Sequence, residues 1–159
     1  MKKIIAHRGN LNGPNRLLEN LPIYIDDALN KNYEAEIDLH YDNNKLYLGH
    51  DFPQHEITFN WLKERSQKLW IHCKTFSALA FCNEHDELLN YFFHDLDKYI
   101  ITSKKFIWAY PGNYGNENTI IVMPEHVEEL EFAIKLLNTH GGICTDYAER
   151  VRNETIGFN

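Results

Sequence analysis

Long apolar runs are missing from this sequence of 159 residues. No segment stays apolar over the ~20 residues that a helix needs to cross a bilayer. The first six residues resemble the start of a signal peptide, but His7 and Arg8 interrupt them before an apolar region forms. We therefore expect no membrane span and a cytoplasmic protein.

Cysteine is also scarce. The three cysteines, Cys73, Cys82 and Cys144, are odd in number and lack the Cys-x-x-Cys spacing that is typical of zinc sites. We expect them to be reduced and to act as small apolar residues of an intracellular fold. This pattern argues against structural zinc.

Positively charged residues are also scarce. Sixteen Lys and Arg residues face 23 Asp and Glu residues, which gives a net charge of -7. No segment gathers the basic residues that a nucleic-acid backbone or an anionic membrane requires, so nucleic acid is not an expected partner. An acidic protein of this kind can bind a phosphate only through a local cation, either a metal or a placed Arg or Lys.

The composition is otherwise that of a folded globular protein. Hydrophobic residues make up 43% of the chain and aromatic residues 13%. The length suits one domain, and no internal repeat, low-complexity tract or charged linker divides residues 1–159. We expect a single domain.

Short apolar runs alternate with amphipathic segments along the chain. The 3.6-residue pattern predicts four helices, at Leu18–Asn30, Thr58–Ser66, Ser77–Leu88 and His126–Asn138. The short apolar runs predict eight strands, at Lys3–His7, Glu34–His40, Leu69–Cys73, Tyr91–His94, Lys98–Thr102, Phe106–Tyr110, Thr119–Met123 and Gly142–Asp146. A small hairpin arm at Lys45–Leu48 is expected in addition.

Strands that alternate with helices predict an α/β fold with a parallel sheet, and eight of them predict a TIM-type (β/α)8 barrel. Such a barrel typically takes ~250 residues, so this chain is short for it. The gaps 95–97 and 103–105 can hold only turns. We therefore expect a compact barrel that lacks several outer helices, with antiparallel hairpins among the later strands as the alternative.

The missing helices leave part of the barrel wall uncovered, around the fifth and sixth strands. This wall is expected to be apolar, and covering it by a second copy of the chain would remove it from water. We therefore expect a homo-oligomer.

Polar side chains follow or occupy the first two strands. His7 and Arg8 end the first, and Glu36 and Asp38 alternate on the second, where they share one face. Apolar neighbours indicate that this second strand is buried, and buried carboxylates need a partner, most simply a cation. Imidazoles, a guanidinium and acids are the groups that phosphoester chemistry requires.

These motifs, taken in order, resemble the glycerophosphodiester phosphodiesterase family of the phospholipase-C-like phosphodiesterase superfamily. The matching segments are Ile5–Gly9, Glu19–Asn20, Glu36–Asp38 and Gly49–Asp51, followed more weakly by Trp70–Lys74 and Thr145–Asp146. The resemblance is specific in the first half of the chain and follows only the order of strands in the second. It implies a TIM-type barrel whose site lies at the C-terminal ends of the strands.

The resemblance also implies roles for individual residues. It implies that His7 and His50 act as acid and base and that Arg8 holds the phosphate. It implies that Glu36 and Asp38 bind a divalent metal ion, such as Mg²⁺, Ca²⁺ or Mn²⁺.

The chain departs from the family pattern at the third carboxylate ligand, where it has His72. An imidazole suits Mn²⁺, Zn²⁺ or Fe²⁺ better than the hard ions Mg²⁺ and Ca²⁺. His72 is therefore either a metal ligand or a hydrogen-bonded core histidine. Lys74 shares its strand face and is expected to bind phosphate. Glu19 either adds a metal ligand, holds Arg8, or is an ordinary acid at a helix start.

Aromatic residues on the sixth strand are candidates for substrate contact. Trp108 and Tyr110 share one side of that strand and are expected to line a pocket for the organic substituent, with core packing as the alternative. At the ends of the last two strands, Glu125 and Asp146 are weaker candidates for the site.

The other histidines are expected to have no catalytic role. A structural role is expected for His40 and His94. Surface positions are expected for His55, His85, His126 and His140.

The sequence therefore predicts a phosphoric diester hydrolase. It would carry out metal-assisted hydrolysis of a small glycerol-type phosphodiester, with His7 and His50 as the acid–base pair. Two alternatives stay open: a non-catalytic protein that binds a phosphate ligand, and a metal-independent lyase of the phospholipase C type that uses both histidines and Arg8.

Overall fold

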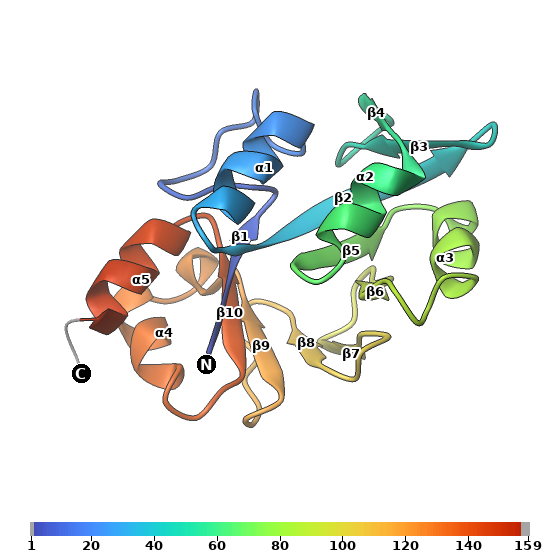
Figure 1. Ribbon diagram of the computed structural model, residues 1–159. Coiled ribbons are helices and arrows are strands. Elements are labelled where there is room, and N and C mark those ends of the chain that lie inside the picture. The colour runs from blue at the N-terminus through green and yellow to red at the C-terminus, as the bar shows by residue number, and fades with distance from the viewer. Residues whose placement is uncertain (1, 157–159) are drawn as a thin grey trace.

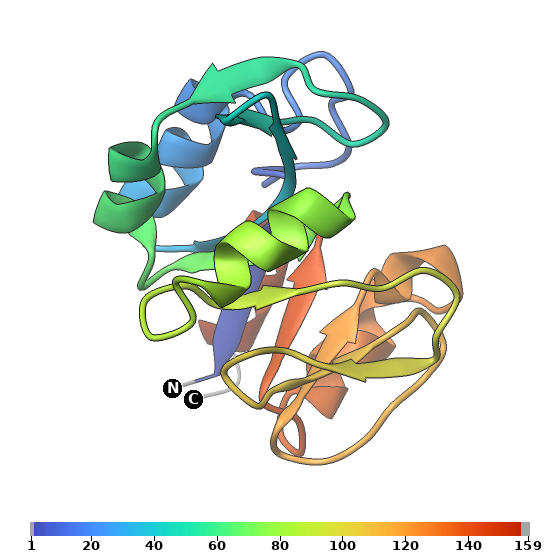
Figure 2. The ribbon, with the colours of Figure 1, turned by 90° about the vertical axis from the view of Figure 1, so that its right-hand side faces the viewer.

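The structure is a computed structural model, and it describes residues 2–156 (Figures 1 and 2). Ten strands belong to one sheet: β1 (Lys3–His7), β2 (Glu34–Asp42), β3 (Lys45–Leu48), β4 (His55–Ile57), β5 (Leu69–Cys73), β6 (Tyr91–Phe92), β7 (Tyr99–Ile101), β8 (Ile107–Ala109), β9 (Thr119–Val122) and β10 (Gly142–Thr145). The helices are α1 (Pro22–Asn30), α2 (Phe59–Arg65), α3 (Phe76–Asn83), the 3₁₀ helix η1 (Pro124–His126), α4 (Leu130–Leu136) and α5 (Ala148–Ile156).

The sheet curls into half a barrel. Its parallel strands follow the order β6-β5-β2-β1-β10-β9-β8, and β7 pairs antiparallel with β8 at one end. In residues 2–156 no strand ladder joins β6 to β7; the two ends meet where the Ser103 N–H donates to the Tyr91 carbonyl at 2.9 Å. The expected α/β fold with a parallel sheet is confirmed, whereas a complete eight-stranded barrel is not seen.

The antiparallel direction of β7 follows from the length of the turn after it. A parallel connection needs a crossover of about a dozen residues, and only 102–106 separate β7 from β8. The strand expected at Lys98–Thr102 therefore forms a hairpin, which was the alternative for the later strands.

Helices cover only part of the sheet's outer face. The helices α1 and α3 pack on β2, and α5 packs on β1. Within the described part of the chain, no helix lies between β6 and β9, as expected for a barrel that lacks outer helices. Figure 1 shows β2 continuing past the barrel wall to pair with β3, which forms the expected hairpin arm.

Local sequence signals set the starts of three helices. Pro22 occupies the first turn of α1, where its missing N–H costs little. The hydroxyl of Thr58 accepts from the Trp61 N–H at the start of α2, and that of Thr75 accepts from the Ala78 N–H at the start of α3.

Three expected helices are clearly shorter than the sequence pattern suggested, and the one expected at Ser77–Leu88 ends at Asn83. The helix expected from Leu18 begins only at Pro22, because Asn20 adopts a left-handed backbone with φ 61°. The helix expected at His126–Asn138 is divided into η1 and α4, and the apolar Val127 within the expected range is 53% exposed.

The helix α5 and the strand β4 were not predicted from the sequence. The helix α5 is mostly polar, and within residues 148–155 its buried residues are Ala148 and Val151, so it offers little of the periodic apolar signal that predicts a helix. The strand β4 has three residues, too few for a visible alternation.

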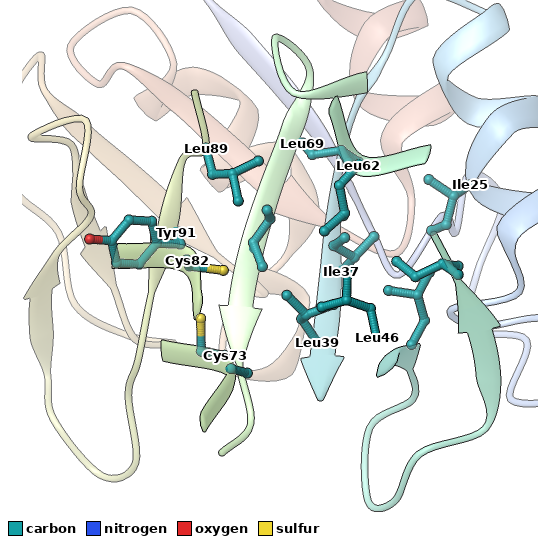
Figure 3. Packing of buried hydrophobic residues seen from close by; sticks show 14 of the residues in the cluster. Ile25, Ile37, Leu39, Leu46, Leu62, Leu69, Cys73, Cys82, Leu89 and Tyr91 are labelled. Atoms are coloured by element: carbon teal, nitrogen blue, oxygen red, sulfur yellow. The ribbon is translucent and has the colours of Figure 1, made fainter. Parts of the chain in front are cut away.

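The outer face of the sheet carries the larger hydrophobic core. On β2 and β5 every second residue points outward, including Ile37 and Leu69, and packs under the helices (Figure 3). Both side chains are fully buried, and each contributes roughly 1.5–3 kcal/mol of transfer free energy. The intervening residues of the same strands face the concave side.

The concave side holds a second core. Its members come from the parallel strands and the segment after β9: Ile5, Trp70, Phe92, Trp108, Ile120, Val122, Met123 and Cys144. This core fills the half-barrel below the C-terminal ends of the strands, so polar side chains further along the same strands sit on an apolar floor.

The longest helices among residues 2–156 have nine residues, and none of the described helices is long and apolar enough to cross a membrane.

Apolar side chains are exposed on the part of the wall that has no helix. Leu96 is 86% exposed and Ile101 is 72% exposed. We expect the chain to self-associate through this wall, and the change of both residues to Lys to weaken association tenfold or more, because each buried apolar side chain is worth roughly 1.5–3 kcal/mol. Analytical ultracentrifugation over a concentration series measures this, with Ile23→Lys on α1, 67% exposed, as the control. A wild-type chain that stays monomeric at high concentration would contradict the prediction.

Candidate active site

Polar side chains from four neighbouring strands meet at the C-terminal end of the half-barrel. The register pairs His7 of β1 with Glu36 of β2, and Asp38 of β2 with His72 of β5. Asp146 follows β10, which lies on the other side of β1. Because parallel strands end at the same edge of a sheet, residues far apart in sequence form one site.

Glu36, Asp38 and His72 form a group with the geometry of a metal site. Each offers one ligand atom, and these atoms lie within 4.8 Å of one another. The His72 Nδ1 is 3.2 Å from Asp38 Oδ1 and 3.9 Å from Glu36 Oε1. All three side chains are nearly buried.

The surroundings of His72 fix which ring nitrogen faces the carboxylates. Its Nε2 lies 3.3 Å from the carbonyl oxygen of His94, and its ring stacks on those of Phe92 and His94. A carbonyl only accepts, so Nε2 carries the hydrogen, and in the neutral ring Nδ1 presents its lone pair to the acids. This is the tautomer of a metal-binding imidazole whose second nitrogen is held by a carbonyl.

The two carboxyl groups have opposite pKa shifts. Burial alone would raise the pKa of Asp38, but the close contacts with His72, Arg8 and Lys74 outweigh burial and lower it. Burial and the neighbouring charge of Asp38 raise the pKa of Glu36. Asp38 therefore holds the fixed negative charge of the site.

Asp38 also leaves a buried oxygen without a hydrogen bond, namely Oδ1. Buried polar atoms are rarely left unpaired, and such an oxygen between a second acid and an imidazole lone pair is well suited to a cation. The donor set of Glu36, Asp38 and His72 therefore fits a divalent metal ion.

Asn20 holds Asp38 in place by two hydrogen bonds. The Asn20 Nδ2 donates to Asp38 Oδ2, and the Asp38 backbone N–H donates to Asn20 Oδ1, both at 2.9 Å. The sequence contained Asn20 in the Glu19–Asn20 motif but gave no sign of this role, which depends on the left-handed backbone of Asn20.

Arg8 stands between the acids as the main cation of the site. Its Nη1 donates to Glu19 Oε2 at 3.2 Å, and its Nε lies 2.9 Å from Asp38 Oδ2. The Nε–H does not point at that oxygen, so this buried donor makes an ion pair but no hydrogen bond. Of the expectations for Glu19, the contact with Arg8 is the one that the structure shows.

Lys74 supplies a second positive charge on the same side. Its Nζ lies 3.5 Å from Asp38 Oδ1, and its side chain is 19% exposed. Lys74 and Arg8 therefore flank Asp38 and leave positive charge available to an anion.

His7 is oriented by Asp146. Its Nδ1 lies 2.8 Å from Asp146 Oδ1, so Nδ1 carries the hydrogen, and its Nε2 lies 4.0 Å from Glu36 Oε2. Burial alone would lower the pKa of His7, but the hydrogen bond to Asp146 and the nearby Glu36 raise it. The Asp146 N–H in turn donates to Glu125 Oε1 at 2.8 Å. Both late acids thus take part in the site, Glu125 through Asp146.

His50 lies on the loop after the hairpin arm. Its Nδ1 lies 2.7 Å from Asp51 Oδ1, and its side chain is 43% exposed. Burial and the charge of Arg8 lower its pKa, so His50 lies within electrostatic reach of the site.

Gly49 allows the turn that places His50. With φ 153°, a Cβ on Gly49 would lie 2.2 Å from the Phe52 carbonyl oxygen. The Gly49 carbonyl lies 2.8 Å from His40 Nε2, which accords with the structural role expected for His40.

The two aromatic candidates differ. Trp108 is 5% exposed, and in the concave core it stacks on Trp70 and packs against Phe92. Trp108 is therefore a core residue, which was the alternative expected for it. Tyr110 is 45% exposed and contacts the ring of His94, which stacks on His72, so it stands at the rim of the site.

The surface position expected for His140 is wrong. His140 is 4% exposed, and its Nε2 accepts from the Gly115 N–H at 3.0 Å. Its Nδ1 lies 2.9 Å from the carbonyl of Leu136, at the end of α4, so the ring joins two loops.

Comparison with known proteins gives a likeness of fold. No protein-family model matches the sequence, and no curated protein matches it. A glycerophosphodiester phosphodiesterase from Parabacteroides distasonis has a TM-score of 0.64 and 13% identity, over 99% of this chain and 98% of that chain. One from Thermotoga maritima has a TM-score of 0.55 and 14% identity, over 97% and 99%. The resemblance predicted from the order of motifs is thus confirmed at the level of the fold.

The contact between His7 and Asp146 predicts a pKa change. Asp146→Asn removes the negative charge that helps raise the pKa of His7, so we expect that pKa to fall below its wild-type value. NMR titration of the imidazole in the presence of a chelator measures it. The matched control is Asp97→Asn, an exposed acid, which should leave the pKa of His7 unchanged. An equal pKa in wild type and Asp146→Asn would contradict the assigned contact.

Proposed function

We propose that this chain catalyses the metal-assisted hydrolysis of a small glycerol-type phosphodiester. The observation that carries this proposal is the convergence of His7, Arg8, Glu36, Asp38 and His72 at one end of the half-barrel. The likeness of fold to two glycerophosphodiester phosphodiesterases supports it.

Glu36, Asp38 and His72 would hold the metal ion. When bound, a divalent ion neutralises phosphate charge and polarises a phosphoryl oxygen. Two carboxylates and one imidazole form a mixed oxygen and nitrogen donor set, which favours Mn²⁺ over Mg²⁺ or Ca²⁺.

Arg8 and Lys74 would bind the non-bridging oxygens of the phosphate. Arg8 has a buried Nε–H that makes no hydrogen bond to any residue in the range 2–156, so this N–H can be donated to an anion. The two cations would also stabilise the negative charge that develops on the phosphoryl oxygens during attack.

The two histidines would share the proton transfers. The raised pKa of His7 suits a group that holds a proton and gives it to the leaving alcohol oxygen. The lowered pKa of His50 suits a neutral base that takes the proton of the attacking hydroxyl or water. If a vicinal hydroxyl of the substrate attacks, a cyclic phosphate forms first and water opens it in a second step.

A metal-independent lyase of the phospholipase C type is the second candidate. It is favoured by the two cations that already face Asp38: Arg8 at 2.9 Å and Lys74 at 3.5 Å. These contacts compensate the buried charge without a metal ion, so both candidates must be separated by experiment.

Chelation separates these candidates. With Mn²⁺ we expect turnover of glycerophosphocholine and of bis(p-nitrophenyl) phosphate, and we expect EDTA to abolish it and Mn²⁺ to restore it. Undiminished turnover in EDTA with a cyclic product would support the lyase. Phosphate binding without turnover, under every divalent metal tried, would support a non-catalytic binding protein and contradict the proposal.

Removal of either histidine tests the acid–base assignment. His7→Ala and His50→Ala should each lower kcat by about 10²–10⁴-fold, the usual contribution of a placed acid or base. Steady-state kinetics measures this, with His126→Ala, an exposed histidine outside the site, as the control. A His50→Ala variant with wild-type kcat would exclude His50 as the base.

A further inference from the structure

The side chain of Asn10 is fully buried in the loop that follows β1, and it makes four hydrogen bonds. Its Nδ2 donates to Glu19 Oε1 at 3.0 Å and to Asp146 Oδ1 at 2.8 Å. Its Oδ1 accepts from the Asn15 N–H and from the Tyr24 hydroxyl, each at 3.2 Å. The amide therefore has all of its hydrogen atoms and its oxygen engaged.

These partners allow only one orientation of the amide. The two carboxylates accept hydrogen bonds, and the Asn15 N–H can only donate. A rotation of the amide by 180° would place its oxygen against the oxygens of Glu19 and Asp146, and its NH₂ group against the Asn15 N–H. The nitrogen of Asn10 is thus fixed between the two acids.

Each of these acids holds one functional side chain. Glu19 accepts from the guanidinium of Arg8, and Asp146 accepts from the imidazole of His7. Through these two acids, the Nδ2 of Asn10 sets the position of the Arg8 side chain relative to that of His7. In the described residues the Asn10 side chain makes no hydrogen bond to Arg8 or His7, although the Asn10 backbone N–H donates to the His7 carbonyl at 2.9 Å.

We propose that Asn10 is a positioning residue that couples Arg8 to His7 through Glu19 and Asp146. This inference rests on the proposed function, because it assigns Asn10 a part in arranging the same site. The two N–H groups of an amide have a fixed angle, so the two carboxylates, and the side chains bound to them, keep a fixed separation.

The isosteric change Asn10→Asp tests the coupling. It keeps the size of the side chain, removes both donors and places a third carboxylate against Glu19 and Asp146. Tyr24→Phe is a milder variant, since it removes only one hydrogen bond to the oxygen of Asn10. Asn12→Asp is the matched control: it makes the same chemical change in the same loop, at an exposed side chain that bonds Glu149.

Three measurements on the full chain read out the coupling. Asn10→Asp should lower kcat for glycerophosphocholine by about 10–100-fold, the usual cost of removing a group that supports a site's ligands. It should also weaken the binding of inorganic phosphate in EDTA by about tenfold, measured by calorimetry, and should shift the NMR signal of the His7 Nδ1–H. Tyr24→Phe should change each readout in the same direction by less, and Asn12→Asp should leave all three within about twofold or unshifted.

A merely structural role of Asn10 predicts another result. Asn10→Asp would then lower the melting temperature, while the folded protein would keep wild-type kcat, phosphate affinity and His7 signal; that result would overturn the proposal. If wild type turns over no substrate, the proposed function fails, but the phosphate and NMR measurements still decide on Asn10. If Asn10→Asp does not fold, an unchanged set of readouts in Tyr24→Phe overturns the coupling, and a graded change supports it.

Discussion

The structure depends on how the buried charge of Asp38 is compensated. This carboxylate has no exposed surface and is faced by Arg8, His72 and Lys74 within 3.5 Å. An uncompensated carboxylate in such surroundings would cost several kcal/mol, so the cations Arg8 and Lys74 must stay near it. Arg8 directly follows β1 and Lys74 directly follows β5, and these strands are the two neighbours of β2, so the folding of the centre of the sheet brings both cations to Asp38.

The alternation of β2 allows a reactive site and a stable core on the same strand. Ile37 faces the helices and is fully buried, whereas Glu36 and Asp38 on either side of it face the concave surface. A shift of the register by one residue would bring both acids into the apolar core and expose Ile37 to the site. The strand therefore specifies its own register strongly, and the five register pairs with β5 hold Asp38 opposite His72.

The site was predictable from the sequence where strand alternation and motif order carry it, as for His7, Glu36 and Asp38. Asn10 and Asn20 were not, because their roles depend on loop geometry and on partners up to 136 residues away. In the fold, the parallel order followed from the alternation of strands and helices. The direction of β7 depends on the few residues between it and β8. The helix α5 was not predicted because its described residues bury little apolar surface.

His72 shows how the chain can depart from the family pattern and keep a metal-binding geometry. A carboxylate at this position would add a third negative charge beside Glu36, whose pKa is already raised by burial and by Asp38. Repulsion would then raise that pKa further and favour protonation of a ligand that must be ionised. A neutral imidazole avoids this repulsion, and stacking on Phe92 and His94 holds its ring in place. An imidazole at this position therefore lowers the negative charge of the proposed metal site, and it suits metals that accept nitrogen ligands better than hard ions.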